Sequence, residues 1–304
     1  MKVFVTGVNG QLGHDVVNEL SARGHTAIGS DLKPVYSGIA DGTFVTRAPF
    51  ISLDITREDA VFKAIDQVKP DALVHCAAWT AVDAAEEPDN RKTVFAVNEE
   101  GTRHIARASR AVHAKMVYIS TDYVFDGTGT EPWQADCTDF APQNVYGESK
   151  LAGEKAVRET LESYFIVRTA WVFGLNGKNF VRTMVTLGKT HRQLRVVSDQ
   201  IGTPTYTPDL ARLLVDMVQT ERFGTYHATN EGGFISWADF ATEIFRQTGQ
   251  DVEVFPVTTA EYGLSKAKRP FNSRLSKEKL AQAGFERLPT WQDALTRYLK
   301  EATL

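Results

Sequence analysis

The chain has 304 residues, of which 42% are hydrophobic and 24% are charged. These ordinary values exclude a disordered or fibrous chain, and a chain of this length can bury a large core. Lys and Arg number 34 against 38 Asp and Glu, for a formal net charge of -4. This balance argues against nucleic acid or an anionic membrane surface as the main partner.

Cysteine content and hydropathy indicate the compartment. Cys76 and Cys137 are too few for a disulfide framework or a zinc cluster, and they fit a reducing environment. An apolar run over residues 2–6 opens the sequence, with no signal-peptide pattern before it. No run approaches about 18 uninterrupted apolar residues. We therefore expect a cytoplasmic protein with no membrane partner.

Short apolar runs alternate with stretches of helical period through the first half of the chain. We expect strands at residues 2–6, 26–30, 50–53, 72–76, 116–120 and 165–172. Leu12, Val16 and Leu20 form one apolar stripe, which predicts a helix over residues 11–23. Thr56 is expected to begin the next helix as part of a capping box. Apolar strands separated by helices predict an α/β fold with a doubly wound parallel sheet of the Rossmann type.

The pattern changes after the first 174 residues. A short strand is expected at residues 194–197, followed by helices that Ser236 and Thr290 cap. We predict a dinucleotide-binding domain over residues 1–174, which includes the catalytic helix. Residues 175–304 are predicted to form a smaller, mixed substrate-binding region, with some elements exchanged between the two.

A glycine-rich turn follows the first expected strand. Gly7, Gly10 and Gly13 lie between that strand and its helix, where glycines allow a tight turn, a close approach of a pyrophosphate and close helix packing. The N–H groups that begin the helix suit the phosphates. The sequence therefore predicts a dinucleotide site that includes Asn9.

Asp31 bears on the choice of cofactor. It follows the second expected strand at the distance where an acid binds the adenosine ribose. A carboxylate there accepts from the 2′-hydroxyl and repels a 2′-phosphate, but Lys33 could soften that repulsion. Both NADH and NADPH therefore remain candidate cofactors. Residues 33–50 are predicted to form an exposed loop beside this end of the site.

Tyr146 and Lys150 are spaced to share one helix face. A neighbouring ammonium favours the phenolate, so we expect Lys150 to lower the pKa of Tyr146 toward the working range. Thr121 follows the expected strand at 116–120, at the edge where open α/β sheets bind ligands. It could hydrogen-bond a substrate carbonyl and complete a hydroxyl–Tyr–Lys set.

In combination, these motifs resemble those of the extended short-chain dehydrogenase/reductases. Four segments are similar, more narrowly, to the dTDP-4-dehydrorhamnose reductase family: residues 120–127 (STDYVFDG), 168–174 (RTAWVFG), 199–205 (DQIGTPT) and 269–275 (RPFNSRL). The resemblance implies NAD(P)H-dependent reduction of the C4 ketone of dTDP-4-dehydro-6-deoxy-L-mannose to dTDP-L-rhamnose.

The resemblance also implies roles for individual residues. Thr121, Tyr146 and Lys150 would be catalytic. Cofactor contacts would come from Gly7, Asn9, Gly10, Gln11, Leu12, Asp31, Asp54, Ile55, Ala77, Ala78, Thr80, Asn98, Tyr146 and Lys150. The substrate would contact Val82, Thr121, Asp122, Tyr146 and Trp171.

Departures from related patterns narrow the expectation. Tyr123 stands where the related dehydratases carry a glutamate, which argues against dehydration. Some members of the resembled family dimerise around magnesium. Asp15 offers one acid, but residues 196–199 lack the adjacent acid pair, so we expect no metal and a monomer or weak homodimer. Trp237 and Trp291, at the starts of two helices, are expected in the core.

Two alternatives remain open at this stage. The chain could reduce another nucleotide-activated 4-keto sugar, because a few loop side chains set sugar specificity. It could also be a non-catalytic, NADP-binding regulatory subunit, similar to the β-subunit of methionine adenosyltransferase. The intact set of Thr121, Tyr146 and Lys150 favours the enzyme.

Overall fold

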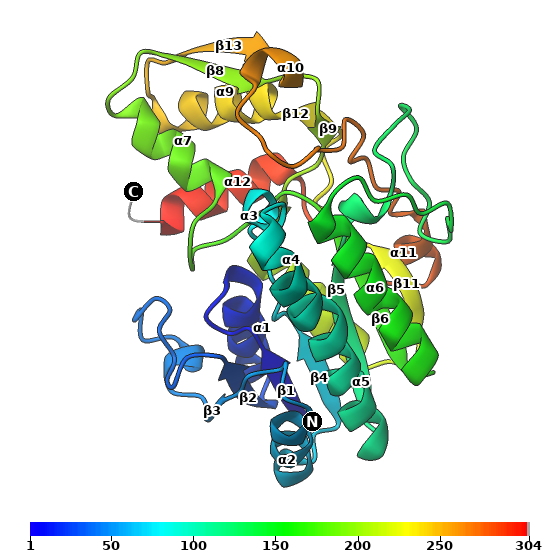
Figure 1. Cartoon of the computed structure of the whole chain (residues 1–304). Helices are drawn as coiled ribbons and strands as arrows, with labels where there is room; N and C mark the ends of the chain where they lie inside the picture. The colour runs from blue at the N-terminus through cyan, green and yellow to red at the C-terminus, as the bar shows by residue number, and fades with distance from the viewer. Residues whose placement is uncertain (303–304) are drawn as a thin grey trace.

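A seven-stranded parallel sheet runs through the computed structural model, which describes residues 1–302 (Figure 1). Its spatial order is β11-β6-β5-β4-β1-β2-β3. The strands are β1 (Lys2–Thr6), β2 (Thr26–Asp31), β3 (Phe50–Ser52), β4 (Ala72–His75), β5 (Lys115–Thr121), β6 (Tyr164–Thr169) and β11 (Gly224–His227). The order reverses beside β1, so the doubly wound parallel fold predicted from the sequence is confirmed.

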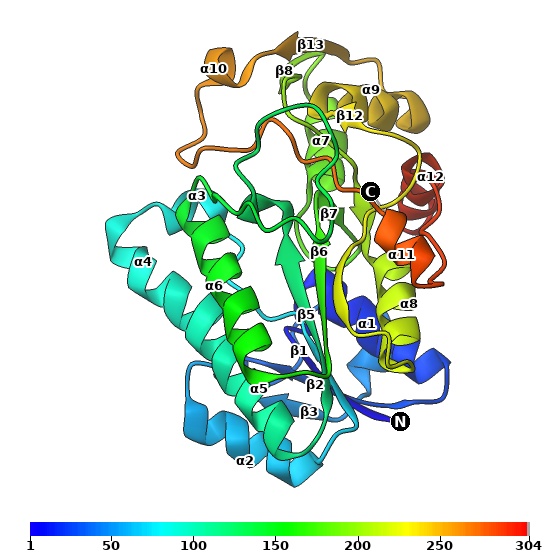
Figure 2. The same ribbon diagram turned by 90° about the vertical axis from the view of Figure 1, so that its right-hand side faces the viewer.

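Helices cover both faces of this sheet (Figure 2). One face carries α1 (Gln11–Ala22) and α8 (Thr207–Val218). The other carries α2 (Glu58–Val68), η2 (Ala96–Gly101), α5 (Thr102–Ala111) and α6 (Val145–Thr160). Helix α4 (Pro88–Phe95) packs beside the start of α6. Because both faces are buried, the inner strands are almost wholly apolar: Val3, Phe4 and Val5 of β1 have no exposed surface.

A second group of elements lies at one end of the sheet, around its own apolar core (Figure 1). Its strands are β7 (Val172–Phe173), β8 (Gln193–Val197), β9 (Ile201–Gly202), β10 (Thr205–Tyr206), β12 (Ile235–Ser236) and β13 (Glu253–Val257). Its helices are α7 (Phe180–Gly188), α9 (Trp237–Thr248), α10 (Thr259–Tyr262) and α12 (Trp291–Glu301). Two short helices, α3 (Val82–Ala85) and α11 (Glu278–Gln282), and the single turns η1 (Phe44–Thr46) and η3 (Asp122–Val124) complete the order. Although α8 and β11 come from the second half of the chain, they pack on or pair within the main sheet.

Two expectations differ from the structure by more than a residue at an element's end. The strand expected at 165–172 ends at Thr169, because Trp171 has a left-handed backbone (φ +51°) that turns the chain into β7. Thr56 does not cap α2, which begins after Arg57 without a side-chain cap. The hydroxyl of Thr56 donates instead to Asp54, at 2.7 Å.

The caps expected on the later helices are confirmed. Ser236 and Asp239 form a reciprocal capping box at the start of α9, and the hydroxyl of Thr290 accepts from the amide of Asp293 at the start of α12. Residues 33–49 have little regular structure except η1, as expected for a loop.

A buried ion pair fixes α6 to the sheet. Arg168 of β6 donates to both carboxylate oxygens of Glu154, at 2.8 and 2.9 Å, and neither residue has exposed surface. The hydroxyl of Ser120 also donates to Glu154, at 2.6 Å. Burial opposes ionisation of this carboxyl, but Arg168 holds the pKa of Glu154 below its ordinary value. One turn earlier on the same helix lies Lys150, so this pair bears on the geometry of the site.

Candidate active site

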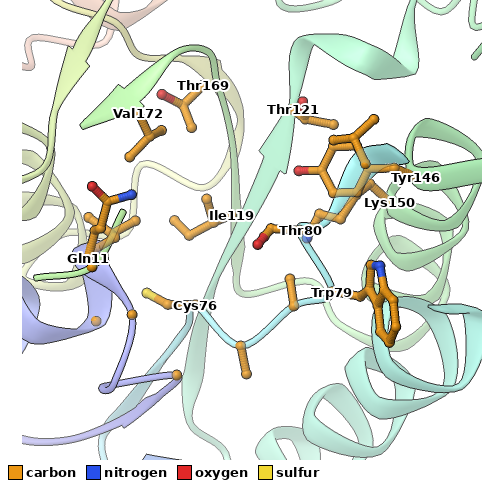
Figure 3. A pocket seen from close by; sticks show the side chains of 18 of the residues that line it. Gln11, Cys76, Trp79, Thr80, Ile119, Thr121, Tyr146, Lys150, Thr169 and Val172 are labelled. Atoms are coloured by element: carbon orange, nitrogen blue, oxygen red, sulfur yellow. The ribbon is translucent and has the colours of Figure 1, made fainter. Parts of the chain in front are cut away.

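One cavity of about 1020 Å³ opens where the parallel strands end. It is lined both by the glycine-rich turn after β1 and by Tyr146 and Lys150 of α6. Figure 3 shows Thr121, Tyr146 and Lys150 grouped on one side, with Gln11 across the cavity from them. Its volume is at the upper end of the range for ligand pockets, which suits two large ligands held side by side.

The glycine-rich turn has the geometry of a phosphate cradle. Gly7 has φ +73°, and a Cβ there would lie 2.6 Å from the amide nitrogen of Ala77. A Cβ at Gly13 would lie 2.4 Å from the carbonyl oxygen of Gly7, so only glycine lets α1 approach the turn this closely. Helix α1 begins at Gln11 with no side-chain cap, which leaves its first N–H groups free for an anion.

A loop from the second half of the chain holds this turn in place. Asn176 donates to the carbonyl oxygens of Asn9 and Gly10, at 3.1 Å each. The side-chain oxygen of Gln11 accepts from the amide of Gly174 at 2.8 Å. Sequence reasoning missed Asn176, and no local pattern marks it, because its partners are more than 160 residues away.

Asp31 lies at the end of β2 and lines the cavity. Its two carboxylate oxygens accept from the amides of Asn9, at 3.0 Å, and Leu32, at 2.8 Å. These bonds join the second strand to the glycine-rich turn and fix the carboxylate in the cavity wall. A carboxylate oxygen has lone pairs left for one further donor.

The three expected catalytic side chains come from two neighbouring elements. Thr121 ends β5, and Tyr146 and Lys150 lie on the first turns of α6. The helix begins at Val145, where Asn144 caps it by accepting from the amide of Gly147 at 2.8 Å. Tyr146 and Lys150 are therefore on the same face.

The electrostatics of this group differ from the expectation. Burial raises the pKa of Tyr146 above its ordinary value, and Lys150 does not counter it. Burial also lowers the pKa of Lys150 to about 7, and its ammonium lies 4.1 Å from the ring centroid of Tyr118. The prediction that Lys150 lowers the pKa of Tyr146 was wrong. Tyr146 is protonated at neutral pH, which is the form that can donate a proton.

Most residues that the sequence nominated line this one cavity. They are Gly7, Asn9, Gly10, Gln11, Leu12, Asp31, Asp54, Ile55, Ala77, Ala78, Thr80, Val82, Thr121, Asp122, Tyr146, Lys150 and Trp171. Asn98 is not among the lining residues. It lies behind them in η2, accepts from the amide of Trp79 at 2.8 Å and donates to the hydroxyl of Ser149 at 2.9 Å. It thereby ties the segment that carries Thr80 to the catalytic helix.

An aromatic wall closes the cavity on the side of the second group of elements. The rings of Trp171 and Trp237 stack with centroids 3.7 Å apart, and Phe180 lies 4.6 Å from Trp237. All three line the cavity. Trp237 is half-buried and packs against the core of the second group, as expected, but it also lines the cavity. Trp291 is buried as expected.

A carboxyl and a guanidinium complete the wall beside Tyr146. Asp122 is buried and accepts from the hydroxyls of Thr121, at 3.0 Å, and Ser273. Burial raises the pKa of Asp122 to about 6. Arg269 also lines the cavity and donates to the phenol oxygen of Tyr123 at 3.2 Å. Both Ser273 and Arg269 lie in the segment 269–275 singled out from the sequence.

Comparison with known proteins agrees with this geometry. The family described as RmlD substrate binding domain matches residues 1–304. The chain belongs to this family. It is 41% identical to a dTDP-4-dehydrorhamnose reductase of Streptomyces griseus over 302 residues, which cover 96% of this chain and 91% of that protein. The identity is 38% to the spore coat polysaccharide biosynthesis protein SpsK of Bacillus subtilis, over 99% of this chain and 97% of the relative.

Solved structures of the RmlD family have the same fold. A dTDP-4-dehydrorhamnose reductase of Bacillus anthracis in complex with NADP superposes with a TM-score of 0.89 at 40% identity, covering 99% of both chains. The resemblance drawn from the sequence motifs is thereby confirmed.

Asp15 belongs to α1 and is absent from the residues that line the catalytic cavity. No group of three or more His, Cys, Asp or Glu side chains within residues 1–302 is arranged to hold a metal ion. Within the same residues, no helix has the length and apolar character needed to cross a bilayer.

Asp15 is 8% exposed, and one of its carboxylate oxygens has no hydrogen-bond partner.

Replacing Asp15 with Asn should change how stability depends on pH. Burial raises the pKa of Asp15 to about 7, so the unfolded carboxyl ionises first as the pH rises from about 4. The wild type therefore loses stability between pH 4 and 7, by roughly 4 kcal/mol for about three pKa units. We expect Asp15→Asn to gain stability relative to the wild type over this window, measured by urea unfolding at pH 4.5 and pH 8.

The half-buried Glu19 on the same helix provides a control. Glu19→Gln removes only a surface ion pair with Arg23, which contributes about 0–1 kcal/mol. A relative stability of Asp15→Asn that is the same at both pH values would contradict the assignment of a raised pKa to Asp15.

Proposed function

We propose that this protein reduces the C4 ketone of dTDP-4-dehydro-6-deoxy-L-mannose to dTDP-L-rhamnose with a nicotinamide cofactor. The observation that carries the proposal is the single cavity in which a phosphate cradle meets Thr121, Tyr146 and Lys150. Several relatives of the RmlD family carry the name of this activity.

The cofactor-binding half of the site fits NADPH or NADH. The crowded positions of Gly7 and Gly13 and the free N–H groups of α1 suit a pyrophosphate. Asp31 would accept from the adenosine ribose, and Thr80 and Lys150 lie on the side of the catalytic group. When bound, the cofactor supplies the hydride that adds to C4 of the sugar.

The chain's own residues would orient the ketone and donate the proton. Thr121 would hydrogen-bond the C4 oxygen and orient the ketone. Tyr146 would give its phenolic proton to that oxygen as negative charge develops there, which yields the C4 hydroxyl. Such general-acid assistance contributes about 10²–10⁴-fold. Lys150, buried one turn from Tyr146 on the same helix face, would hold the nicotinamide ribose.

The remaining lining residues suit the sugar nucleotide. Trp171 and Val82 offer apolar surface to the 6-deoxy sugar, and Asp122 can accept from a sugar hydroxyl. Arg269 places a positive charge in the same wall, which suits the diphosphate of the substrate.

The test is turnover followed by absorbance at 340 nm with NADPH or NADH. Oxidation is expected with dTDP-4-dehydro-6-deoxy-L-mannose and not with dTDP-glucose, which has no ketone. Cofactor binding without turnover of this ketone would contradict the proposed reaction. Turnover of other nucleotide-linked 4-keto sugars at equal kcat/KM would contradict the proposed sugar specificity.

Asp31→Ala should weaken the binding of NADH more than that of NADPH. The change removes the ribose acceptor and also a charge that repels a 2′-phosphate, so these effects partly cancel for NADPH. We expect the Kd of NADH to rise about tenfold and that of NADPH to rise less, measured by quenching of protein fluorescence. Equal weakening of both would count against the ribose assignment.

We also propose that the protein works in the cytoplasm as a monomer or weak homodimer. The thiols of Cys76 and Cys137 are unpaired, which suits a reducing compartment. Light scattering on the purified protein would determine the oligomeric state.

A further inference from the structure

Residues 265–269 form a short segment that joins α10 to the wall of the cavity. We call this segment the clasp. It passes α3 and carries Arg269, one of three Lys or Arg side chains that line the cavity (Figure 2). The other two are Lys150 and Lys178. The conformation of the clasp therefore decides where a positive charge is presented to the substrate side of the site.

A single carboxylate on α3 accepts three hydrogen bonds from the clasp. One oxygen of Asp83 accepts from the amides of Lys266 and Ala267, at 3.1 Å each. The other oxygen accepts from the guanidinium of Arg269, at 2.6 Å. Asp83 follows Val82, so the same turn carries a residue of the cavity and the residue that holds the clasp.

The clasp is also tied to the catalytic helix. Asn144, which caps α6, donates to the carbonyl oxygen of Lys268 at 2.8 Å. Arg269 donates to the phenol oxygen of Tyr123, whose ring lies edge-on to Tyr146 with centroids 5.6 Å apart. Bonds to Asp83, Tyr123 and the hydroxyl of Ser265, which accepts from Nε of Arg269 at 3.2 Å, thus fix the direction of the guanidinium. Its two remaining N–H groups are free for an anion.

We propose that Asp83 is a positioning residue, which orders the clasp and aims Arg269 at the diphosphate of the nucleotide sugar. This inference rests on the proposed function for the identity of the ligand. Asp83 is absent from the residues that line the cavity, so it acts through Arg269 and not by contact with the substrate. An ordered guanidinium binds an anion more tightly than a mobile one, because less side-chain entropy is lost on binding.

The main variant is Asp83→Asn, which keeps an oxygen for the two clasp amides and removes the charge that holds Arg269. We expect the KM for the nucleotide sugar and the Kd of dTDP to rise about tenfold, since one charge-assisted bond no longer orients the guanidinium. The kcat and the Kd of NADPH should stay within about twofold. Asp83→Glu should restore part of the affinity.

A matched control and a double variant distinguish a positioning role of Asp83 from a general loosening of the clasp. Glu87→Gln breaks only the exposed ion pair that the same clasp makes through Lys266, and it should leave KM unchanged. If Asp83 acts through Arg269, then Asp83→Asn should add little to the loss caused by Arg269→Ala. Losses that multiply in the double variant would overturn the positioning role.

Calorimetry with dTDP distinguishes failure of this inference from failure of the proposed function. Binding of dTDP by the wild type without turnover of the 4-keto sugar contradicts the reaction alone. Equal binding of dTDP by the wild type and Asp83→Asn contradicts the role of Asp83 alone. A fall in kcat at unchanged KM would also overturn the inference, because it would place Asp83 in the chemical step.

Discussion

Tyr146→Phe should lower kcat by about 10²–10⁴-fold, because it removes the proton donor and little else. The phenol is half-buried in the cavity wall, and its raised pKa keeps it protonated at neutral pH. Phenylalanine fills the same space, so the cavity keeps its shape. Stopped-flow absorbance at 340 nm measures the loss in the hydride-transfer step, and fluorescence titration should give a Kd for NADPH within about threefold of the wild type.

Tyr226→Phe is the matched control for this variant. Its hydroxyl donates to the carbonyl oxygen of Arg222, at 2.7 Å, and it does not line the cavity. We expect its kcat to stay within about twofold of the wild type. A Tyr146→Phe enzyme that keeps more than about a tenth of the wild-type kcat would assign the proton to another donor.

Arg168→Met should cost about 3–5 kcal/mol of the free energy of unfolding. The substitution leaves Glu154 as a buried carboxylate without its bidentate partner, which costs more than the pair itself contributes. The midpoint of urea unfolding measures the loss. The loosened helix α6 should also lower kcat, since Lys150 lies one turn before Glu154.

An exposed ion pair on the same helix gives the comparison. Glu159→Gln removes a contact with Arg103 at 3.1 Å, where the Glu159 side chain is 64% exposed. Its expected cost is about 0–1 kcal/mol. Equal destabilisation by the two variants would contradict the assignment of Arg168 and Glu154 as a buried pair on which the packing of α6 depends.

The central sheet could be predicted because its strands are nearly pure apolar runs. Residues 2–6 match β1 without error, and the other early strands differ from the prediction by a few residues. The exception is β11, which completes the sheet beside β6. It was missed because its four residues, Gly224–His227, have no apolar run and owe their strand conformation to pairing with residues 165–168.

The site could be predicted where one local segment carries the signal. The glycine-rich turn, Thr121 and the Tyr146–Lys150 pair each lie within one short segment, and all of them line the same cavity. Asn176 and Arg269 could not be assigned roles from spacing, because their partners lie far away in the chain.

Burial explains the remaining errors. The sequence places Lys150 one turn from Tyr146, but it does not reveal how far the fold removes each side chain from water, so the effect of desolvation on each pKa was missed. For the same reason Trp237 could not be assigned to the cavity, since an aromatic residue at a helix start is equally compatible with core packing.

The measurement that tests the central claim most directly is the fate of deuterium from NADPH labelled at the nicotinamide C4 position. We predict that NMR of the product will show deuterium at C4 of dTDP-L-rhamnose, and that the Tyr146→Phe enzyme will form this product more slowly by at least about a hundredfold. Deuterium at another carbon, or a product still carrying the ketone, would contradict reduction at C4.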